Sequence, residues 1–311
     1  MMASLKGRNI LSLKNYSQDE IYQLLAKAME LKRLQKRNEP HRILEGKTIA
    51  VIFHKPSSRT RISFETAASH LGAHPIFLRD DEVKLGEREP IKDMGRVLSG
   101  YVDAAVIRTF KQSDVEELAE YSTMPIINAL TDGYHPMQSL ADLMTILESK
   151  DRLAGLKLAY IGDGNNVANS LMIVAGKLGI NMAVGCPKGY EPDPEVVQFA
   201  TGSIRNMNHA ITITNNPLEA AKDADVIYTD VWASMGQEAE REERLKIFKP
   251  YQVNSDLMEV AKPSAIFLHC LPAHRGEEVT DEVIESKQSL VFEQAENRLH
   301  TAKAALALLI R

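Results

Sequence analysis

The feature that most constrains the fold is a short apolar run that ends in a turn of hydroxyl-bearing and basic residues. Residues 48–53 (TIAVIF) carry no charged side chain, which is typical of a strand buried on both faces of a parallel sheet. Residues 56–58 (PSS) follow, and residues of these types favour turns and helix caps. Ile62, Phe64 and the alanines beyond them then indicate a helix with one apolar face.

The same turn carries groups that suit an anion. A helix N-terminus leaves backbone N–H groups free and presents the positive end of the helix dipole. Ser57, Ser58 and Thr60 add hydroxyl donors. Arg59 and Arg61 add planar guanidinium groups, which match the geometry of phosphate oxygens. The pattern predicts a phosphate pocket, although a capped helix with two surface arginines would show the same five residues.

Strand-like and helix-like segments alternate along the whole chain. Ser17 and Glu20 form a capping box at the start of an amphipathic helix that precedes the first strand. Further strands are expected at 75–78, 104–107, 125–128, 156–161, 182–186, 225–230 and 265–269. Helices are expected at 90–101, 115–121, 140–149, 167–178 and 295–310, with polar loops at 80–89 and 132–138. This order predicts an α/β protein of two doubly wound parallel-sheet domains, joined by helices, with the C-terminal helix packing back on the first domain.

The length and composition agree with this architecture. A chain of 311 residues fits two domains, which we place at 1–150 and 151–311, with the last helix (about 295–311) returning to the first. A net charge of −5 argues against a general nucleic-acid binder. Two cysteines exclude a disulfide framework and fit a reducing compartment. Because neither a signal-like run nor a membrane-spanning segment is evident, we expect a cytoplasmic protein with no membrane partner.

Unusual polar residues gather where the predicted strands end. They lie at 57–61, Arg108, 135–138, 165–166, 230–235 and 269–272. Ligands of open α/β sheets bind at the carboxyl ends of the strands, so these segments are the candidate site. Arg108 and His135 are candidate hydrogen-bond donors to an oxyanion, and Gln138 is a candidate partner for an amide group. Asp230 is a candidate partner for an ammonium group.

Two patterns at strand ends have more than one interpretation. Residues 162–164 (GDG) look like the start of a dinucleotide fingerprint, but Val167 stands where the fingerprint needs its third glycine. Residues 269–275 (HCLPAHR) offer at most three zinc ligands without a second cysteine pair, so a thiol that orients a substrate is favoured over a metal site. A buried strand-end cysteine is a further interpretation of Cys270. We expect neither a metal nor an organic cofactor.

Together these motifs resemble those of the carbamoyltransferases, and of the ornithine branch of that family in particular. The motifs that resemble the shared carbamoyl phosphate site are S-x-R-T-R at 57–61, H-P-x-Q at 135–138 and Arg298. The motifs that resemble the ornithine branch are Asp230 with S-M-G at 234–236, and H-C-L-P at 269–272. The similarity runs over nearly the whole chain, and the motifs occur in the family's order.

The resemblance implies transfer of the carbamoyl group of carbamoyl phosphate to the δ-amine of L-ornithine, which gives L-citrulline and phosphate. The catalytic residues that it implies are Arg108, His135, Gln138, Asp230 and Cys270. The carbamoyl phosphate ligands that it implies are Ser57, Ser58, Arg59, Thr60, Lys84, Arg108, His135, Pro136, Met137, Gln138, Cys270, Leu271 and Arg298. The ornithine ligands that it implies are Asn166, Asp230, Ser234 and Met235.

Lys84 departs from the family pattern, since ornithine enzymes often carry glutamine or histidine at this place. In the family this loop reaches the active site of a neighbouring subunit, so the resemblance implies a homotrimer, or a multiple of trimers, with shared sites. Two other functions stay open: a carbamoyltransferase that uses another amine such as putrescine, and a catalytically silent, ligand-binding homologue. The S-M-G run argues against the first, and the complete set of catalytic residues argues against the second.

Overall fold

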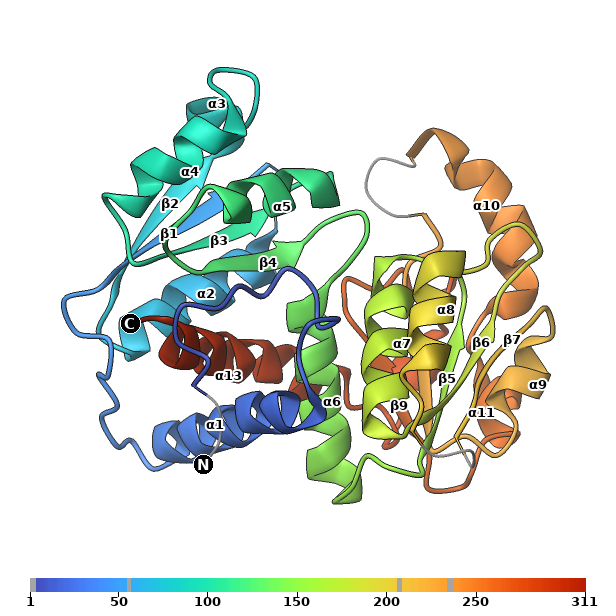
Figure 1. The fold of residues 1–311 in the computed structure, drawn as a ribbon. Coiled ribbons are helices and arrows are strands. Elements are labelled where there is room, and N and C mark those ends of the chain that lie inside the picture. The colour runs from blue at the N-terminus through green and yellow to red at the C-terminus, as the bar shows by residue number, and fades with distance from the viewer. Residues whose placement is uncertain (1–3, 55–56, 206–208, 234–237) are drawn as a thin grey trace. The chain divides into compact units, whose positions relative to one another are not determined.

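The computed structural model describes residues 4–54, 57–205, 209–233 and 238–311, and the chain forms two compact units (Figure 1). Unit 1 comprises Met1–Met144 and Glu296–Arg311, and unit 2 comprises Thr145–Ala295. Each unit is built on one sheet whose strands are all parallel. The predicted fold class, an α/β chain with two parallel sheets, is therefore confirmed.

The sheet of unit 1 has four strands in the order β2-β1-β3-β4. Their bounds are Thr48–Phe53 for β1, His74–Arg79 for β2, Ala104–Arg108 for β3 and Ile126–Leu130 for β4. Strand β1 has the bounds predicted for it, and all of its residues except the first are buried. Strands β1 and β3 are central and apolar because both of their faces are covered by helices.

Helices cover both faces of this sheet (Figure 1). On one face lie α4, Ile91–Ser99, and α5, Gln112–Glu120, whose buried side chains join Ile52 and Ile107 in one apolar cluster. On the other face lie α2, Ser58–His70, and the C-terminal part of α13, Val291–Leu309.

The last helix returns to the first domain, as predicted, and packs there on the first helix. Helix α1, Gln18–Lys36, starts with the expected capping box, in which Ser17 and Glu20 each accept a hydrogen bond from the backbone of the other. Two buried lysines join the helices. Lys32 on α1 donates to Asn297 over 2.8 Å, and Lys303 on α13 donates to Gln35 over 2.7 Å.

Two predicted loops are shorter in the structure than the sequence suggested. The polar segment 80–89 begins with a short helix, α3, Asp80–Val83. The segment 132–138 gives way at Pro136 to α6, Pro136–Lys150, since proline is well suited to the first turn of a helix. Helix α6 begins in unit 1 and ends in unit 2.

The sheet of unit 2 has five strands in the order β7-β6-β5-β8-β9. Their bounds are Lys157–Ile161 for β5, Asn181–Gly185 for β6, Ile211–Thr214 for β7, Val226–Thr229 for β8 and Ile266–His269 for β9. The helices of this unit are α7, Asn166–Leu178; α8, Pro194–Gly202; α9, Pro217–Ala221; α10, Arg241–Phe248; α11, Ser255–Glu259; and α12, Asp281–Ile284. Short 3-10 turns, Glu238–Glu240 and Lys249–Tyr251, flank α10. Across the described ranges, we find no helix with an apolar stretch long enough to cross a lipid bilayer.

Candidate functional site

In unit 1 the strand order reverses between β1 and β3, and the predicted phosphate residues gather at this place. Phe53, the last residue of β1, pairs with Arg108, the last residue of β3. The backbone N–H of His54 donates to the carbonyl oxygen of Arg108 over 2.9 Å. The reversal of strand order opens a crevice at the carboxyl ends of a parallel sheet. The turn after β1 and the side chain of Arg108 therefore belong to one binding edge.

The N-terminus of α2 has the capped geometry that the sequence predicts. Ser57 is the N-cap, and its hydroxyl accepts a hydrogen bond from the backbone N–H of Thr60. The same hydroxyl donates to Oγ1 of Thr60 over 3.0 Å. Thr60 is buried, Arg59 is half-buried and Ser58 is exposed, so polar groups face both inward and outward at this end of the helix. The first turn contains no acidic residue that would compete with an anion.

Arg298 brings together three segments that are far apart in the chain. Its guanidinium group donates to Oε1 of Gln138 on α6 and, over 3.2 Å, to Oγ1 of Thr60 on α2. Gln138 in turn donates to Oδ1 of Asp142 over 2.8 Å. All four side chains are buried. A buried arginine and an oriented amide therefore lie next to the capped turn.

His135 lies at the start of α6 and is almost fully buried. Its carbonyl oxygen accepts hydrogen bonds from the backbone N–H groups of Gln138 and Ser139. Burial holds the pKa of His135 well below its usual value, and the charges of Arg298 and Arg108 lower it further. At neutral pH the imidazole is therefore uncharged and able to donate one hydrogen bond. Pro136 and Met137 form the first helical turn beside it, and both are buried.

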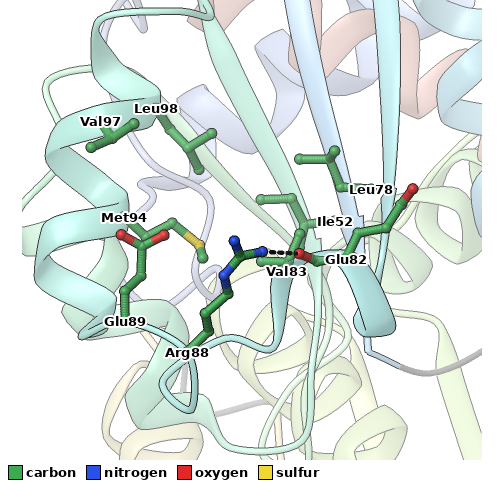
Figure 2. Close-up of a pocket in the computed structure, with 9 residues that line it drawn as sticks. All are labelled: Ile52, Leu78, Glu82, Val83, Arg88, Glu89, Met94, Val97 and Leu98. Atoms are coloured by element: carbon green, nitrogen blue, oxygen red, sulfur yellow. Dashed lines mark hydrogen bonds between the residues drawn. The ribbon is translucent and has the colours of Figure 1, made fainter.

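Lys84 directly follows α3 in the segment after β2, and it is exposed with a left-handed backbone, φ 43°. A cavity of about 440 Å³ lies beside this segment. Figure 2 shows its lining: Met94, Val97 and Leu98 of α4 lie with Glu89 on one side, and side chains from β1, β2 and α3 lie on the other. The side chain of Arg88 lies between them and reaches toward the carbonyl oxygen of Glu82. Within unit 1, Lys84 is not among the residues that line this cavity.

In unit 2 the strand order reverses between β5 and β8, and the second group of predicted residues gathers there. Asn165 follows β5 and is the N-cap of α7, where its Oδ1 accepts from the backbone N–H groups of Val167 and Ala168. Its Nδ2 donates to Oδ2 of Asp230 over 2.8 Å. The amide of Asn165 therefore orients the carboxylate of Asp230, a role that the sequence analysis did not assign to it.

Asp230 also joins β8 to β9. Its Oδ1 accepts the thiol hydrogen bond of Cys270 over 2.9 Å and a further bond from the backbone N–H of Val231. Asp230 is buried, while Cys270 is partly exposed. Leu271 follows in a left-handed conformation, φ 56°. The structure thus brings a carboxylate and a thiol into direct contact at the strand ends.

The other predicted ornithine ligands have mixed outcomes. Asn166 is the first residue of α7, beside the N-cap, so it lies at the same strand edge as Asp230. Ser234 and Met235 lie outside the described residues.

The backbone of Glu191 and Pro192 approaches Gly164 so closely that a Cβ atom on residue 164 would lie 2.2 Å from it. This close approach accounts for the second glycine of the G-D-G run without a nucleotide.

A buried ion pair that sequence reasoning missed lies next to this edge. Arg244 on α10 donates to Oδ2 of Asp163 and to the carbonyl oxygen of Trp232, each over 3.0 Å. Burial raises the pKa of Asp163 to about 6, because the charge of Arg244 offsets only part of the desolvation. The contact ties α10 to the turn after β5. Only its spatial closeness reveals it, since the two residues are 81 positions apart.

Two groups of potential metal ligands come together within the described parts of the chain. Asp230, His269 and Cys270 form one, and His274, Glu277 and Glu278 form the other. In the first group the side chains already bond to protein groups: Cys270 to Asp230, and His269 to Glu278. The donors therefore have partners in the protein itself.

Comparison with protein families identifies both halves of the chain. Residues 8–148 match the model described as the carbamoyl-P binding domain of aspartate/ornithine carbamoyltransferase. Residues 154–309 match the model described as the Asp/Orn binding domain of the same family. The two models together span nearly the whole sequence.

Individual relatives and solved structures agree with these models. Over 310 residues, covering 100% of this chain and 98% of the relative, the sequence is 55% identical to the ornithine carbamoyltransferase of Pyrococcus abyssi. It is 53% identical to that of Bacillus subtilis over 99% of this chain and 95% of the relative. The solved ornithine carbamoyltransferase of Pyrococcus furiosus superposes with a TM-score of 0.97 at 55% identity, covering 99% of both chains. The fold, the family models and these full-length similarities lead to one conclusion: the chain belongs to the aspartate/ornithine carbamoyltransferase family.

Proposed function

We propose that this chain transfers the carbamoyl group of carbamoyl phosphate to the δ-amine of L-ornithine, giving L-citrulline and phosphate. The observation that carries the choice of an amine acceptor is the 2.9 Å contact between the thiol of Cys270 and Oδ1 of Asp230. A carboxylate held by Asn165 and Cys270 at the strand ends suits a substrate that carries an ammonium group. The similarity to relatives named ornithine carbamoyltransferase supports the same choice.

Carbamoyl phosphate is assigned to unit 1. Ser57, Ser58, Arg59 and Thr60 bind its phosphate at the N-terminus of α2, where the helix dipole favours negative charge. Arg108 lies between the phosphate and the carbonyl group. Gln138, held by Arg298 and Asp142, accepts a hydrogen bond from the carbamoyl amine. The ligands assigned to this substrate on other segments are Lys84, Pro136, Met137, Cys270 and Leu271.

His135 and Arg108 stabilise the oxygen of the tetrahedral intermediate. Burial keeps His135 uncharged, and the single N–H of its neutral imidazole donates a hydrogen bond to this oxygen. Arg108 supplies the positive charge, and it is buried at the end of β3, where water screens it little. Both side chains are buried, so little water has to reorganise around them when charge develops.

Ornithine is assigned to unit 2. Asp230 pairs with its α-ammonium group, and Asn166, Ser234 and Met235 complete the contacts with its α-amino and α-carboxyl end. Cys270 and Leu271 lie where its δ-amine is held. The neutral δ-amine attacks the carbonyl carbon and a C–N bond forms. The C–O bond to phosphate breaks, phosphate leaves with the electron pair, and it takes up the proton that the nitrogen loses. An amine of this kind titrates at about 10.4 in water, so the reactive form is a minority species at neutral pH.

The assembly proposed with this function is a cytoplasmic homotrimer, or a multiple of trimers, with shared sites. Lys84 is exposed, and the segment that carries it borders a cavity of about 440 Å³ lined by both aliphatic and charged side chains (Figure 2). In this proposal a second copy of the chain covers the cavity, and Lys84 of the first copy then lies at the binding edge of the second.

An acceptor assay tests the proposal. Purified protein is given carbamoyl phosphate with ornithine or with putrescine, and citrulline or carbamoylputrescine is measured. Citrulline formation with little putrescine product is expected. A preference for putrescine would favour the other amine transferase, and binding of both substrates without any product would favour the silent homologue.

A further inference from the structure

We propose that Glu278 is a positioning residue that fixes the loop 270–273 and, through it, the thiol of Cys270. The inference deepens the proposed transfer to ornithine and rests on it. Glu278 lies just after the loop, and its side chain is fully buried. It belongs to none of the motifs described above, and its role emerges only from the contacts of its carboxylate.

One oxygen of Glu278 holds the loop at both ends. Oε1 contacts Nε2 of His269 over 3.2 Å, and His269 is the last residue of β9 before the loop. The same Oε1 accepts the backbone N–H of His274, the first residue after the loop. Residues 270–273 lie between these two anchors, so one carboxylate oxygen holds both ends of the loop.

The hydrogen bonds of His269 fix its tautomer. The backbone N–H of Leu271 can only donate, and it lies 2.9 Å from Nδ1 of His269. Nδ1 is therefore the unprotonated acceptor, and the ring proton of the neutral imidazole sits on Nε2. Nε2–H then donates to the carboxylate of Glu278. Glu278 thus sets both the orientation and the tautomer of the ring that receives Leu271.

The backbone of Leu271 needs such support. Its φ of 56° places a γ-branched residue in the left-handed region, where side chains other than glycine are disfavoured. Conformations of this kind persist only where surrounding contacts determine them. The chain of contacts from Glu278 through His269 to the N–H of Leu271 is such a determinant.

Cys270 lies between these anchored residues and has its thiol on Oδ1 of Asp230. Loss of the Glu278 carboxylate would release His269 and His274 together, and the backbone of Leu271 would relax from its left-handed conformation. The thiol would then leave Asp230. Glu278 acts on the reaction through the loop, whereas Asp230 and Cys270 are the residues assigned to contact the substrate.

The thiol itself reports on the loop, independently of catalysis. The chain has two cysteines, and Cys186 is fully buried, with a pKa that burial raises to about 12. Modification of native protein by a thiol reagent such as dithiobis(nitrobenzoate) therefore follows Cys270. We compare Glu278→Ala, which removes both bonds, with Glu278→Gln, whose amide oxygen can still accept both. Glu277→Gln is the matched control, because Glu277 is the partly exposed neighbour that pairs with Arg241.

In Glu278→Ala, we expect modification of Cys270 to become about tenfold faster and the KM for ornithine to rise about tenfold, with the KM for carbamoyl phosphate unchanged. Glu278→Gln and Glu277→Gln should stay within about threefold of wild type in all three measurements. Circular dichroism checks that each variant is folded. Should Glu278→Ala fail to fold, His269→Gln replaces it. Its amide can still donate to Glu278, but it has no acceptor atom at the position of Nδ1, which the N–H of Leu271 uses, so it should also speed modification.

Two results would overturn the proposal. One is a thiol modification rate at the wild-type level in the folded Glu278→Ala or His269→Gln variant. The other is a Glu278→Gln variant as impaired as Glu278→Ala, which would assign the effect to charge and not to the two hydrogen bonds. Because modification needs no turnover, it separates this inference from the transfer reaction: wild-type protein that makes no citrulline would refute the proposed function alone.

Discussion

Arg298 donates a guanidinium hydrogen bond to Oε1 of Gln138, a residue 160 positions earlier in the chain. The bond joins α13 to the first turn of α6, and a second bond from Arg298 reaches Thr60 on α2. The C-terminal helix therefore contributes a buried charge to the phosphate edge of unit 1. This contact gives the return of the last helix to unit 1 a direct role in the site.

Replacement of Arg298 by methionine should impair carbamoyl phosphate binding. The variant loses a buried cation and leaves Gln138 and Thr60 without the donor that orients them. We expect the KM for carbamoyl phosphate to rise at least about tenfold, while the KM for ornithine changes little. Arg298→Lys keeps the charge but lacks the forked guanidinium group that reaches both partners. Its KM for carbamoyl phosphate should therefore lie between those of wild type and Arg298→Met. Equal KM values in wild type and Arg298→Met would contradict this role.

Arg59→Ala should weaken carbamoyl phosphate binding and catalysis together, because a charge-assisted contact to the phosphate is lost. An increase of about tenfold or more in the KM for carbamoyl phosphate is expected. Arg61→Ala is the matched control, since Arg61 pairs with Glu65 over 2.9 Å and lies over the ring of Phe77. The assignment fails if the two substitutions have the same effect in steady-state kinetics.

Asp230→Asn should harm the use of ornithine far more than the binding of carbamoyl phosphate. The substitution removes the charge that pairs with ammonium and sets an amide donor against Nδ2 of Asn165. We expect the KM for ornithine to rise at least about tenfold. Asp223→Asn, at an exposed turn of the same unit, should behave like wild type. Calorimetry with a phosphate-side ligand tests the selectivity: an equal loss of affinity for this ligand and for ornithine analogues would exclude Asp230 as the ammonium partner.

The buried imidazole of His300 should make the folded protein less stable in acid. Burial lowers its pKa from 6.5 to about 4; Lys303 and Lys32 lower it further, whereas Glu296, which bonds to its Nε2, raises it. Between pH 6.5 and about pH 4, the imidazole of His300 binds a proton in the unfolded chain but not in the folded chain. The free energy of unfolding therefore falls as pH drops from about 6.5 to 4, by on the order of 3 kcal/mol at most for this group.

His300→Gln tests this prediction, because glutamine is uncharged at every pH. Urea denaturation at pH 4.5 and pH 7 should show a smaller stability difference in His300→Gln than in wild type. His74→Gln serves as the control, since His74 is exposed at the start of β2 and should leave the pH dependence unchanged. An equal acid sensitivity of His300→Gln and wild type would assign the effect to other groups.

The local structure at the site was predictable because its signals are short-range. The apolar run of β1, the hydroxyl cap at Ser57 and the capping box at Ser17 each follow from a few adjacent residues. The strand-end positions of Arg108 and Asp230 follow from the parallel sheets. The start of α6 at Pro136 was missed, although proline suits a first helical turn. The residues just before it favour a turn, so the whole segment 132–138 was predicted as a loop.

The contacts that orient these side chains were not predictable in the same way. Asn165 was noted only as one of the polar residues at the strand ends, and its bond to Asp230 depends on β5 and β8 being neighbours in the sheet. Glu278 looks like an ordinary acidic residue, and only the fold places it beneath His269. Polar residues that act through other side chains carry no spacing rule, because their partners are set by tertiary structure.

The last prediction concerns the sharing of sites between subunits. If Lys84 completes the site of a neighbour in a closed ring, Arg59→Ala and Lys84→Ala chains should each be nearly inactive. When they are denatured and refolded together in equal amounts, about three-quarters of random trimers are mixed. Each mixed trimer has one interface where an intact Arg59 meets an intact Lys84, so one site in three works. Activity should therefore recover to about a quarter of wild type.

Two controls make this mixing experiment decisive. Each variant is refolded alone, and native mass measurement confirms that every sample forms trimers. Arg61→Ala mixed with Arg59→Ala should show only the activity of the intact Arg61→Ala sites, because both positions lie at the same helix end of one chain. Mixtures of Arg59→Ala and Lys84→Ala that form trimers yet stay as inactive as their parents would mean that Lys84 serves its own chain or has no role in the site. Recovery near a quarter of wild type requires instead that the exposed segment around Lys84 crosses to another subunit.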